Sequence, residues 1–305
     1  MSQHLPPIRQ IQYLLALREE LHFGRAAEKL FVTQSTLSTG IKELETFLGV
    51  TLVERTNKSV AFTQIGEDVV ARGRRIIVHY EEMITHAHNY QDPLSMPIKL
   101  GVIPTIAPYL VANYVSSIKQ SLPDIKLYIR ENTTNNLISE LQDGKLDLLI
   151  LAFPYDVGNL QTQMVFREKL LLGHRKKTKL LTKKQLTSAR LDFNSLPDES
   201  LLLLDDGHCL REHALAGCRL RNQNKIHTFG ANSLQMLIQM VDNDLGMTLI
   251  PEMAVSTGIL RPTQIETREL SDTFFRDIGF VWRKGNYRET ELMDLMGLLS
   301  APTAA

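Results

Sequence analysis

A change in the spacing of apolar residues near Pro97 constrains the fold of this chain more than any other feature. Before Pro97 the apolar residues recur at helical spacing, whereas after it short apolar runs alternate with helical stretches. Such alternation favours parallel βαβ units. The chain has 305 residues, of which 43% are hydrophobic, so it can build two or more cores. The sequence therefore predicts a multidomain protein with a helical N-terminal part and an α/β remainder.

The region before Gly49 is predicted to hold three short helices, at about residues 8–20, 25–30 and 34–48. Thr33 is a candidate N-cap of the third helix, because a Thr hydroxyl accepts hydrogen bonds from the first backbone N–H groups, and Gly49 is a candidate stop. The apolar residues of the third helix fall on one face. They are Leu37, Ile41, Leu44 and Leu48.

A hairpin and a long helix are predicted next. Residues 52–55 and 59–63 have the pattern of two short strands around a polar turn, which is the form of a wing. A helix from Gly66 to about Gln91 would span ~25 residues, or ~38 Å at ~1.5 Å per residue, which is long enough to pair two subunits. The proline-containing residues 92–97 end this helix and supply a linker.

The polar face of the third helix is a candidate DNA-reading surface. A helix-turn-helix presents small polar and basic side chains from its second helix to base edges in the major groove. This pattern alone does not establish DNA binding, because any three-helix region has some polar face. The net charge of residues 1–64, which is only +1, adds little support. The candidate reading residues are Gln34, Ser35, Thr36, Ser38, Thr39 and Lys42, and the candidate phosphate contacts are Arg25, Arg55 and Lys58.

Six blocks of this region resemble, in order and spacing, the N-terminal domain of LysR-type transcriptional regulators. Gly40 departs from the longer polar residue usual in that family, so we expect one base or phosphate contact to be weakened there. The resemblance implies a double-stranded DNA partner. The blocks are FGRAA at residues 23–27, TQSTLS at 33–38, IKELE at 41–45, LGV at 48–50, LVERT at 52–56 and FTQIG at 62–66.

The resemblance also implies the architecture of the whole chain. LysR-type regulators join an all-α winged helix-turn-helix and a dimerising linker helix to an effector domain of two α/β subdomains, similar to a periplasmic binding protein. The chain crosses twice between the subdomains. The implied boundaries are residues 1–64 for the winged helix-turn-helix, 65–92 for the linker helix, 93–97 for a hinge, 98–168 with 273–305 for subdomain I, and 169–272 for subdomain II, which carries both cysteines.

Cys209 and Cys218 are the two cysteines of the chain. Two are too few for a disulfide scaffold, and a structural zinc site needs four ligands, so no metal or cofactor is expected. The commoner fate of a free cysteine is to pack as a small buried hydrophobic residue. The alternative is redox chemistry between two thiols that are close in the sequence.

The segment between the cysteines is predicted to be helical when reduced, with Asp206 as a candidate cap and Gly217 as a candidate end. Cys209 would then lie at a helix N-terminus near His208 and Arg211, where positive charge favours the reactive thiolate. A helix would hold the Cα atoms of the two cysteines ~13.5 Å apart, whereas a disulfide needs less than ~7 Å. The helix must therefore unwind before the pair can close.

The cysteine segment resembles that of OxyR, the peroxide-sensing subfamily of LysR-type regulators. The matching strings are GHCLR at residues 207–211 with the second cysteine nine positions after the first, IPT at 103–105, PYL at 108–110, GKLD at 144–147 and LIP at 249–251. By this resemblance Cys209 is the peroxidatic thiol and Cys218 the resolving thiol. The residues implied to place peroxide near the sulfur, or to support the reactive loop, are Thr105, Thr134, His208 and Arg211. Thr105 as an N-cap of the following helix and His208 as an ordinary loop histidine remain open.

Three functions follow from these observations. The leading one is a peroxide-responsive regulator, in which a disulfide between the two cysteines changes how a homodimer or homotetramer binds its operator DNA. The second is a LysR-type regulator that binds a small organic ligand in the cleft between the subdomains, with the cysteines incidental. The third is a thiol peroxidase, which would not need the N-terminal reading helix, so no enzyme activity is expected.

The expected cellular setting follows from the leading function and from the N-terminus. The chain opens without a signal-peptide pattern, and no window reaches the ~18 uninterrupted apolar residues of a membrane span. We therefore expect a cytoplasmic, nucleoid-associated protein with no membrane partner. By the resemblance, the expected partners are double-stranded DNA, further copies of this chain, hydrogen peroxide as the signal, RNA polymerase, and a glutaredoxin- or thioredoxin-type reductant.

Overall fold

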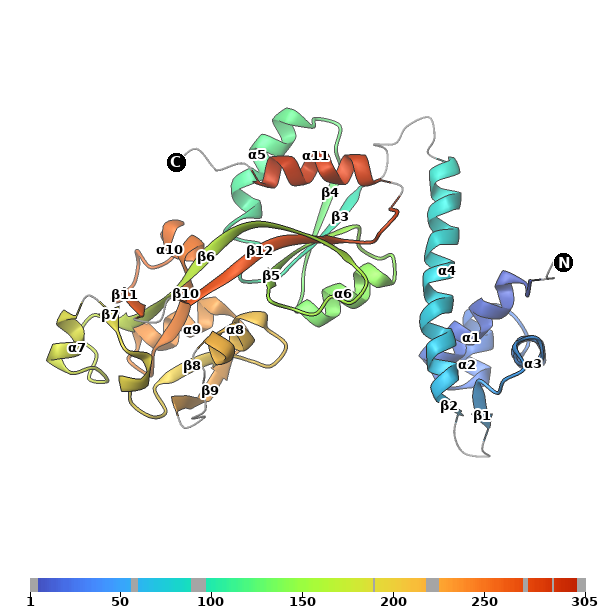
Figure 1. The fold of residues 1–305 in the computed structure, drawn as a ribbon, viewed down its shortest axis with the longest axis horizontal. Coiled ribbons are helices and arrows are strands. Elements are labelled where there is room, and N and C mark those ends of the chain that lie inside the picture. Colours follow the sequence, from blue (N-terminus) through green and yellow to red (C-terminus); the bar gives the residue numbers. More distant parts are fainter. Residues whose placement is uncertain are drawn as a thin grey trace. The chain divides into compact units, whose positions relative to one another are not determined.

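The computed structural model describes residues 5–55, 60–88, 97–188, 190–217, 225–270, 274–286 and 288–300 (Figure 1). The chain divides into two compact units, Met1–Gln91 and Asp92–Ala305. One apolar core lies in the first unit and two lie in the second. Within the described ranges, no helix is both long enough and apolar enough to cross a membrane.

The first unit is a group of helices with a small hairpin. The predicted helices are present, and the predicted caps hold the third one: the Thr33 hydroxyl accepts from the Thr36 N–H at 3.2 Å, and Gly49 has a φ of 69°. The two strands pair antiparallel as a wing, whose tip at residues 56–59 lies outside the described residues. The elements are α1 (Ile8–Glu20), α2 (Phe23–Lys29), α3 (Gln34–Leu48), β1 (Val53–Arg55), β2 (Val60–Phe62) and α4 (Gln64–His88).

The long helix α4 is the element that the sequence predicted as a linker helix. Its N-terminal half packs on the core of the first unit through Val70, and Glu67 forms an ion pair with Arg18 at 2.8 Å. Its C-terminal half keeps large apolar side chains exposed, as a helix that pairs with a second subunit requires. They are Ile76, Tyr80, Met83 and Ile84.

The second unit is built on an eight-stranded sheet with strand order β4-β3-β5-β12-β6-β11-β7, in which β10 also pairs with β6. Two further strands, β8 and β9, form a small sheet of their own. The elements are β3 (Ile98–Val102), α5 (Val111–Ser121), β4 (Leu127–Glu131), α6 (Thr134–Gln142), β5 (Leu148–Phe153), β6 (Gln161–Arg175), α7 (Lys183–Thr187), β7 (Arg190–Leu191), β8 (Leu201–Leu204), α8 (Cys209–Gly217), β9 (Ile226–Ala231), α9 (Leu234–Asp242), β10 (Thr248–Pro251), α10 (Glu252–Ser256), β11 (Ile265–Leu270), β12 (Phe274–Trp282) and α11 (Glu289–Ser300).

The large sheet is mixed rather than parallel. β3 pairs in parallel with β4 and β5, as the predicted βαβ pattern requires. In contrast, β12 runs antiparallel to both β5 and β6, and β10 and β11 run antiparallel to β6. The expectation of parallel βαβ units is therefore wrong for the part of the chain from β6 to β11, because β10 and β11 run in the opposite direction to the long strand β6 with which they pair.

The strands β6 and β12 carry the chain between the two cores of the second unit (Figure 1). One core is built on β3, β5 and β12 with α5 and α11, and the other on β8, β10 and α9. Cys209 packs in the first core although it follows β8, whereas Tyr109 packs in the second although it follows β3. The first turns of α8 therefore contribute side chains to both cores: Cys209 to the first and Leu210 to the second. The subdomain boundary predicted after residue 168 falls inside the continuous strand β6.

Candidate functional site

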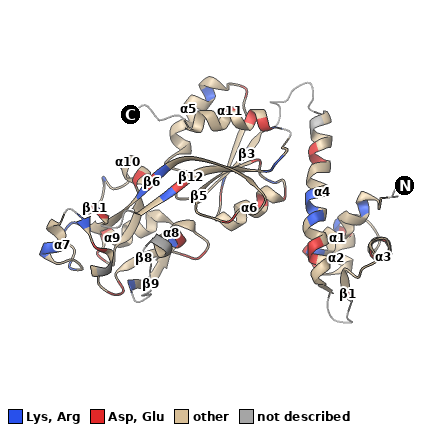
Figure 2. Ribbon diagram, in the orientation of Figure 1, with Lys and Arg blue, Asp and Glu red and all other residues tan. Residues whose placement is uncertain are grey.

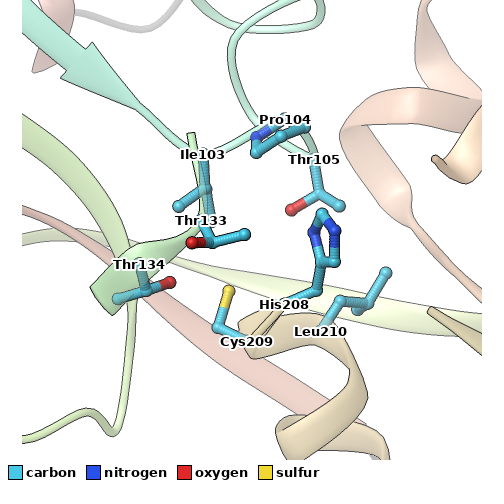
Figure 3. Close-up of a pocket in the computed structure, with 8 residues that line it drawn as sticks. All are labelled: Ile103, Pro104, Thr105, Thr133, Thr134, His208, Cys209 and Leu210. Atoms are coloured by element: carbon cyan, nitrogen blue, oxygen red, sulfur yellow. The ribbon is translucent and has the colours of Figure 1, made fainter. Parts of the chain in front are cut away.

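A narrow recess lies where three chain segments meet, each following the carboxyl end of a strand: β3, β4 and β8 (Figure 3). The turn after β3 and the first residues of α6 and α8 form its walls, which lie too close together in this state to admit a water-sized molecule. Ligands in α/β proteins commonly bind at the carboxyl ends of strands. The lining residues are Ile103, Pro104, Thr105, Thr133, Thr134, His208, Cys209 and Leu210.

Cys209 is the first residue of α8, and its sulfur points into the recess (Figure 3). The side chain is a free thiol and is only 2% exposed. Burial raises the pKa of the Cys209 thiol, whereas the charge of Arg276 and the hydroxyl of Thr134 lower it. The expectation that the helix N-terminus favours the thiolate is therefore wrong for this state, because the loss of solvent outweighs the nearby positive charge.

Arg211, which the sequence placed beside the thiol, contacts the end of β8 instead. Its guanidinium donates to the carbonyl of Leu204 at 3.1 Å and pairs with the carboxylate of Asp206 at 2.9 Å. These contacts tie the first turn of α8 to the preceding strand. Burial lowers the pKa of His208, against the opposing charge of Asp205, so its imidazole is largely neutral at neutral pH and adds little positive charge near the sulfur.

The cation that does act on the thiol is Arg276, which lies on β12 and is 1% exposed. Its guanidinium donates to the Glu168 carboxylate at 2.7 Å, to the Thr105 hydroxyl at 2.7 Å and to the Thr105 carbonyl at 3.0 Å. The second oxygen of Glu168 accepts from the Met253 N–H at 2.8 Å. A buried ion pair needs partners of this kind for each of its polar atoms.

Neither Arg276 nor Glu168 was predicted from the sequence. They are 108 residues apart along the chain, and the strand register places them opposite one another on β12 and β6. The one local signal is a pair of adjacent charged residues, Arg276 and Asp277, within a mostly apolar strand, FFRDIGFVW for β12. A charged residue in such a strand indicates a buried partner without identifying it.

Two buried threonines lie beside the thiol (Figure 3). The Thr105 hydroxyl accepts from Arg276, which leaves its hydrogen to donate into the recess. The Thr134 hydroxyl makes no hydrogen bond of normal geometry within the described chain, although it lies close enough to the sulfur of Cys209 to act on it. Thr105 does not cap α5, as one interpretation held, because that helix begins at Val111.

His213 follows Cys209 by one turn of α8 and is 7% exposed. Among the described residues, neither of its ring nitrogens has a hydrogen-bond partner of normal geometry. Burial and the charge of Arg276 lower the pKa of His213 to about 4, against the opposing influence of the Phe153 and Pro154 backbone and of Asp277. The imidazole is therefore neutral at neutral pH.

Cys218 lies outside the described residues, but the helix that precedes it is described. α8 runs from Cys209 to Gly217 and so ends one residue before Cys218. At a rise of ~1.5 Å per residue, the Cα atoms at the two ends of α8 are ~12 Å apart. The predicted helix between the cysteines is confirmed over this length.

The polar face of α3 carries the predicted DNA-reading residues. The Thr33 hydroxyl lies 2.9 Å from the Ser35 hydroxyl and 2.8 Å from the Thr36 hydroxyl, so the start of the helix presents a group of linked hydroxyls. Arg25 is exposed and its guanidinium binds the Glu20 carbonyl. Of the predicted phosphate contacts, the Arg55 side chain and Lys58 lie outside the described part of the chain. The exposed reading residues are Gln34, Ser35, Thr36, Thr39 and Lys42, and Ser38 is half-buried.

Gly40 faces the interior of the first unit rather than the reading surface. It is buried in α3, and a Cβ atom built there would lie 2.6 Å from the Tyr13 ring. The close approach of α1 and α3 therefore requires a residue without a Cβ atom. The expectation that Gly40 weakens a base or phosphate contact is wrong, because this position packs against α1.

Two family patterns match the chain. The family described as "Bacterial regulatory helix-turn-helix protein, lysR family" matches residues 8–67, and the family described as "LysR substrate binding domain" matches residues 91–301. The HTH-type transcriptional regulator EstR of Acinetobacter baylyi is 36% identical over 98% of each chain. The DNA-binding transcriptional dual regulator OxyR of Escherichia coli is 34% identical, over 92% of this chain and 90% of its own.

Solved structures are similar over nearly the whole chain. A full-length OxyR variant from Pseudomonas aeruginosa is 32% identical, with a TM-score of 0.70 over 97% of this chain and 95% of its own. A hydrogen peroxide-bound OxyR mutant from Corynebacterium glutamicum is 30% identical, with a TM-score of 0.61 over 98% of this chain and 93% of its own. The expected fold class, a winged helix-turn-helix followed by an effector domain similar to a periplasmic binding protein, is confirmed.

Proposed function

The chain belongs to the LysR family of bacterial transcriptional regulators, and from this premise we propose that it senses peroxide through Cys209 and transmits the signal to DNA binding. One observation carries the proposal. The Cys209 sulfur faces a recess whose Thr134 hydroxyl is buried without a hydrogen-bond partner of normal geometry in the described chain. A buried unpartnered hydroxyl is costly, so it indicates a polar molecule that completes the site.

The groups that line the recess match the hydrogen-bonding capacity of hydrogen peroxide, and the recess must widen to admit it. Peroxide oxygens accept and donate hydrogen bonds, Thr105 has a hydrogen to donate, and Thr134 can do either. His208, which also lines the recess, is the third polar side chain proposed to position peroxide. Arg211 contributes indirectly, by tying the first turn of α8 to β8.

The proposed first step oxidises Cys209 to a sulfenic acid. The sulfur attacks one peroxide oxygen, an S–O bond forms, and the O–O bond breaks. Sulfur loses two electrons, and the departing hydroxide takes the thiol proton and leaves as water. Burial raises the pKa of Cys209, so little of the reactive thiolate is present at rest. The positioning of peroxide and the charge of Arg276 must therefore lower the energy of the transition state, in which the sulfur loses its proton.

The proposed second step is attack by Cys218. Its thiolate attacks the sulfenic sulfur, the S–S bond forms and the S–O bond breaks, and the departing hydroxide takes up the proton released by Cys218 and leaves as a second water. Helix α8 places its two ends ~12 Å apart, whereas a disulfide needs Cα atoms within ~7 Å. The helix must therefore unwind, and Cys209 must leave the core in which it packs.

The unwinding is the proposed link from redox state to DNA. Since Cys209 lies where α8 contributes to both cores of the second unit, its departure changes contacts of both subdomains. We propose that this alters how a homodimer or homotetramer holds its operator in the cytoplasm, and that RNA polymerase reads the result. A glutaredoxin- or thioredoxin-type dithiol would restore the reduced state.

A second candidate function is regulation by a small organic ligand in the same effector domain. Two observations favour it: the buried Cys209 has a pKa raised by burial, and one similar relative is named EstR rather than OxyR. In that case the cysteines pack as small hydrophobic residues and oxidise slowly.

The test compares full-length wild type, Cys209→Ser and Cys218→Ser. Each is treated with one equivalent of peroxide, mapped by peptide mass spectrometry, and footprinted on a duplex selected by the wild-type protein from a random-sequence pool. We expect a rapid intramolecular disulfide and an altered footprint in wild type, a sulfenic acid in Cys218→Ser, and neither change in Cys209→Ser. A peroxide-dependent footprint in Cys209→Ser would eliminate the sensor role, and slow oxidation of wild type would favour the organic-ligand function.

A further inference from the structure

Phe31 lies between α2 and α3 in an unusual conformation. Its side chain is 95% exposed, and its φ is 55°, in the left-handed region that aromatic residues rarely adopt. The Phe31 N–H donates to the Glu28 carbonyl at 3.1 Å, and the Val32 N–H donates to the Ala27 carbonyl at 3.0 Å. These two bonds form a Schellman motif, in which Phe31 occupies the position usually taken by Gly or Asn.

Two features of Phe31 oppose the stability of the free protein. A left-handed backbone disfavours any residue with a Cβ atom, and a fully exposed ring leaves apolar surface in water. Asn or Gly would fill the same turn with less strain and less apolar surface. Residues held in strained backbone conformations cluster at functional sites such as ligand-binding segments.

The surroundings of Phe31 indicate the partner. Phe31 precedes Thr33, the N-cap of α3, by two residues, and exposed residues continue from Thr33 through Thr36. In a helix-turn-helix the N-terminal residues of the second helix contact base edges in the major groove. A side chain directly before that helix therefore lies at the wall of the groove, where the deoxyribose carbons and the thymine methyl groups are the apolar parts of DNA.

We propose that the Phe31 ring packs against these apolar carbon atoms of DNA at the entry of α3 into the major groove. The contact is uncharged, so it adds affinity beside the phosphate contacts without releasing counterions. It extends the DNA-binding function of the family and is independent of the peroxide chemistry at Cys209. It also accounts for an aromatic residue at a turn where Asn or Gly would be more stable.

Phe31→Asn in the full-length chain tests the contact, because folding and binding should change in opposite directions. Thermal unfolding should occur at the same or a higher temperature, since Asn tolerates the left-handed turn. Affinity for the selected duplex should fall on the order of tenfold through loss of buried apolar area. Phe31→Tyr, which keeps the ring, should bind nearly as well as wild type.

Leu21→Asn is the matched control within the same unit. Leu21 also has a positive φ, 47°, and is 49% exposed, but it ends α1 rather than preceding the reading helix. Its substitution should affect stability in the same direction as Phe31→Asn and leave DNA affinity unchanged. A Phe31→Asn protein that binds as wild type, or a Phe31→Tyr protein that loses as much affinity as Phe31→Asn, overturns the proposal.

Two further measurements define the contact. The slope of log affinity against log salt should be the same for Phe31→Asn and wild type, whereas Lys42→Ala, which removes a charge, should reduce it. A changed slope for Phe31→Asn would contradict an uncharged contact. Replacing thymine by uracil in the duplex should weaken wild type but not Phe31→Asn if the ring meets thymine methyl groups, and should affect both equally if it meets deoxyribose.

Discussion

Arg276 holds Thr105 by two hydrogen bonds across 171 residues of chain, one to the hydroxyl at 2.7 Å and one to the backbone carbonyl at 3.0 Å. Because the hydroxyl oxygen accepts from the guanidinium, its hydrogen is left to donate into the recess. The same guanidinium pairs with Glu168. One buried cation therefore orients a hydroxyl beside Cys209 and joins β12, β6 and the turn after β3.

Arg276→Met should destabilise the full-length chain by roughly 3–5 kcal/mol, because Glu168 would keep a buried charge without its cation. Adding Glu168→Gln to this variant should recover much of the loss, since the unpaired charge is then removed. Urea unfolding of both variants measures the difference. Arg167→Met is the control: Arg167 forms an exposed pair with Asp277 between the same two strands, at 2.7 Å, and its loss should leave stability nearly unchanged. Equal stability of the single and double variants would argue against the buried pair.

Thr134→Val should slow the reaction of Cys209 with peroxide without destabilising the protein. The change keeps the shape of the side chain and removes a hydroxyl that has no partner of normal geometry in the described chain, so stability should stay the same or rise slightly. Losing one hydrogen bond to the transition state should reduce the rate on the order of tenfold. Stopped-flow measurement of thiol loss in Thr134→Val and in wild type tests this. Equal rates for Thr134→Val and wild type would remove Thr134 from the site.

His213→Gln should flatten the acid side of the stability profile. Burial and Arg276 lower the pKa of His213 to about 4 from the ordinary 6.5. Between these values the unfolded chain binds more protons than the folded chain, so stability rises with pH across the window and is lost as pH falls from 6.5 toward 4. The contribution is roughly 3 kcal/mol over the full window. Urea unfolding at several pH values should show a shallower slope for His213→Gln, and identical slopes would refute the assignment.

Gly40→Ala and Gly297→Ala should have opposite effects, although both replace a glycine inside a helix. A Cβ atom at Gly40 would lie 2.6 Å from the Tyr13 ring, so α1 and α3 must separate, at a cost of about 1–3 kcal/mol. A Cβ atom at Gly297 on α11 meets nothing within 4 Å, so the higher helix propensity of Ala should stabilise by about 0.5–1 kcal/mol. Thermal unfolding of both variants gives the signs. A stabilising Gly40→Ala would mean that α1 and α3 do not require the glycine.

The helices of the first unit, its wing and the helix after Cys209 followed well from local sequence, whereas the pairing of β6 with β12 did not. The N-cap at Thr33, the stop at Gly49 and the helix from Cys209 to Gly217 depend on residues a few positions apart, which is why spacing predicts them. The antiparallel pairing of β6 with β12 was missed, because strand pairing across more than a hundred residues leaves no periodic signal in either strand.

The sequence by itself determined the family, the order of the helices and the position of Cys209 at the start of a helix. Only the tertiary structure decided the chemical environment of that thiol. Helix position predicted a lowered pKa, but packing into the core around β3, β5 and β12 buries the sulfur and raises its pKa. The cation that opposes this is Arg276 rather than the adjacent Arg211, because burial and charge depend on which distant segments pack together.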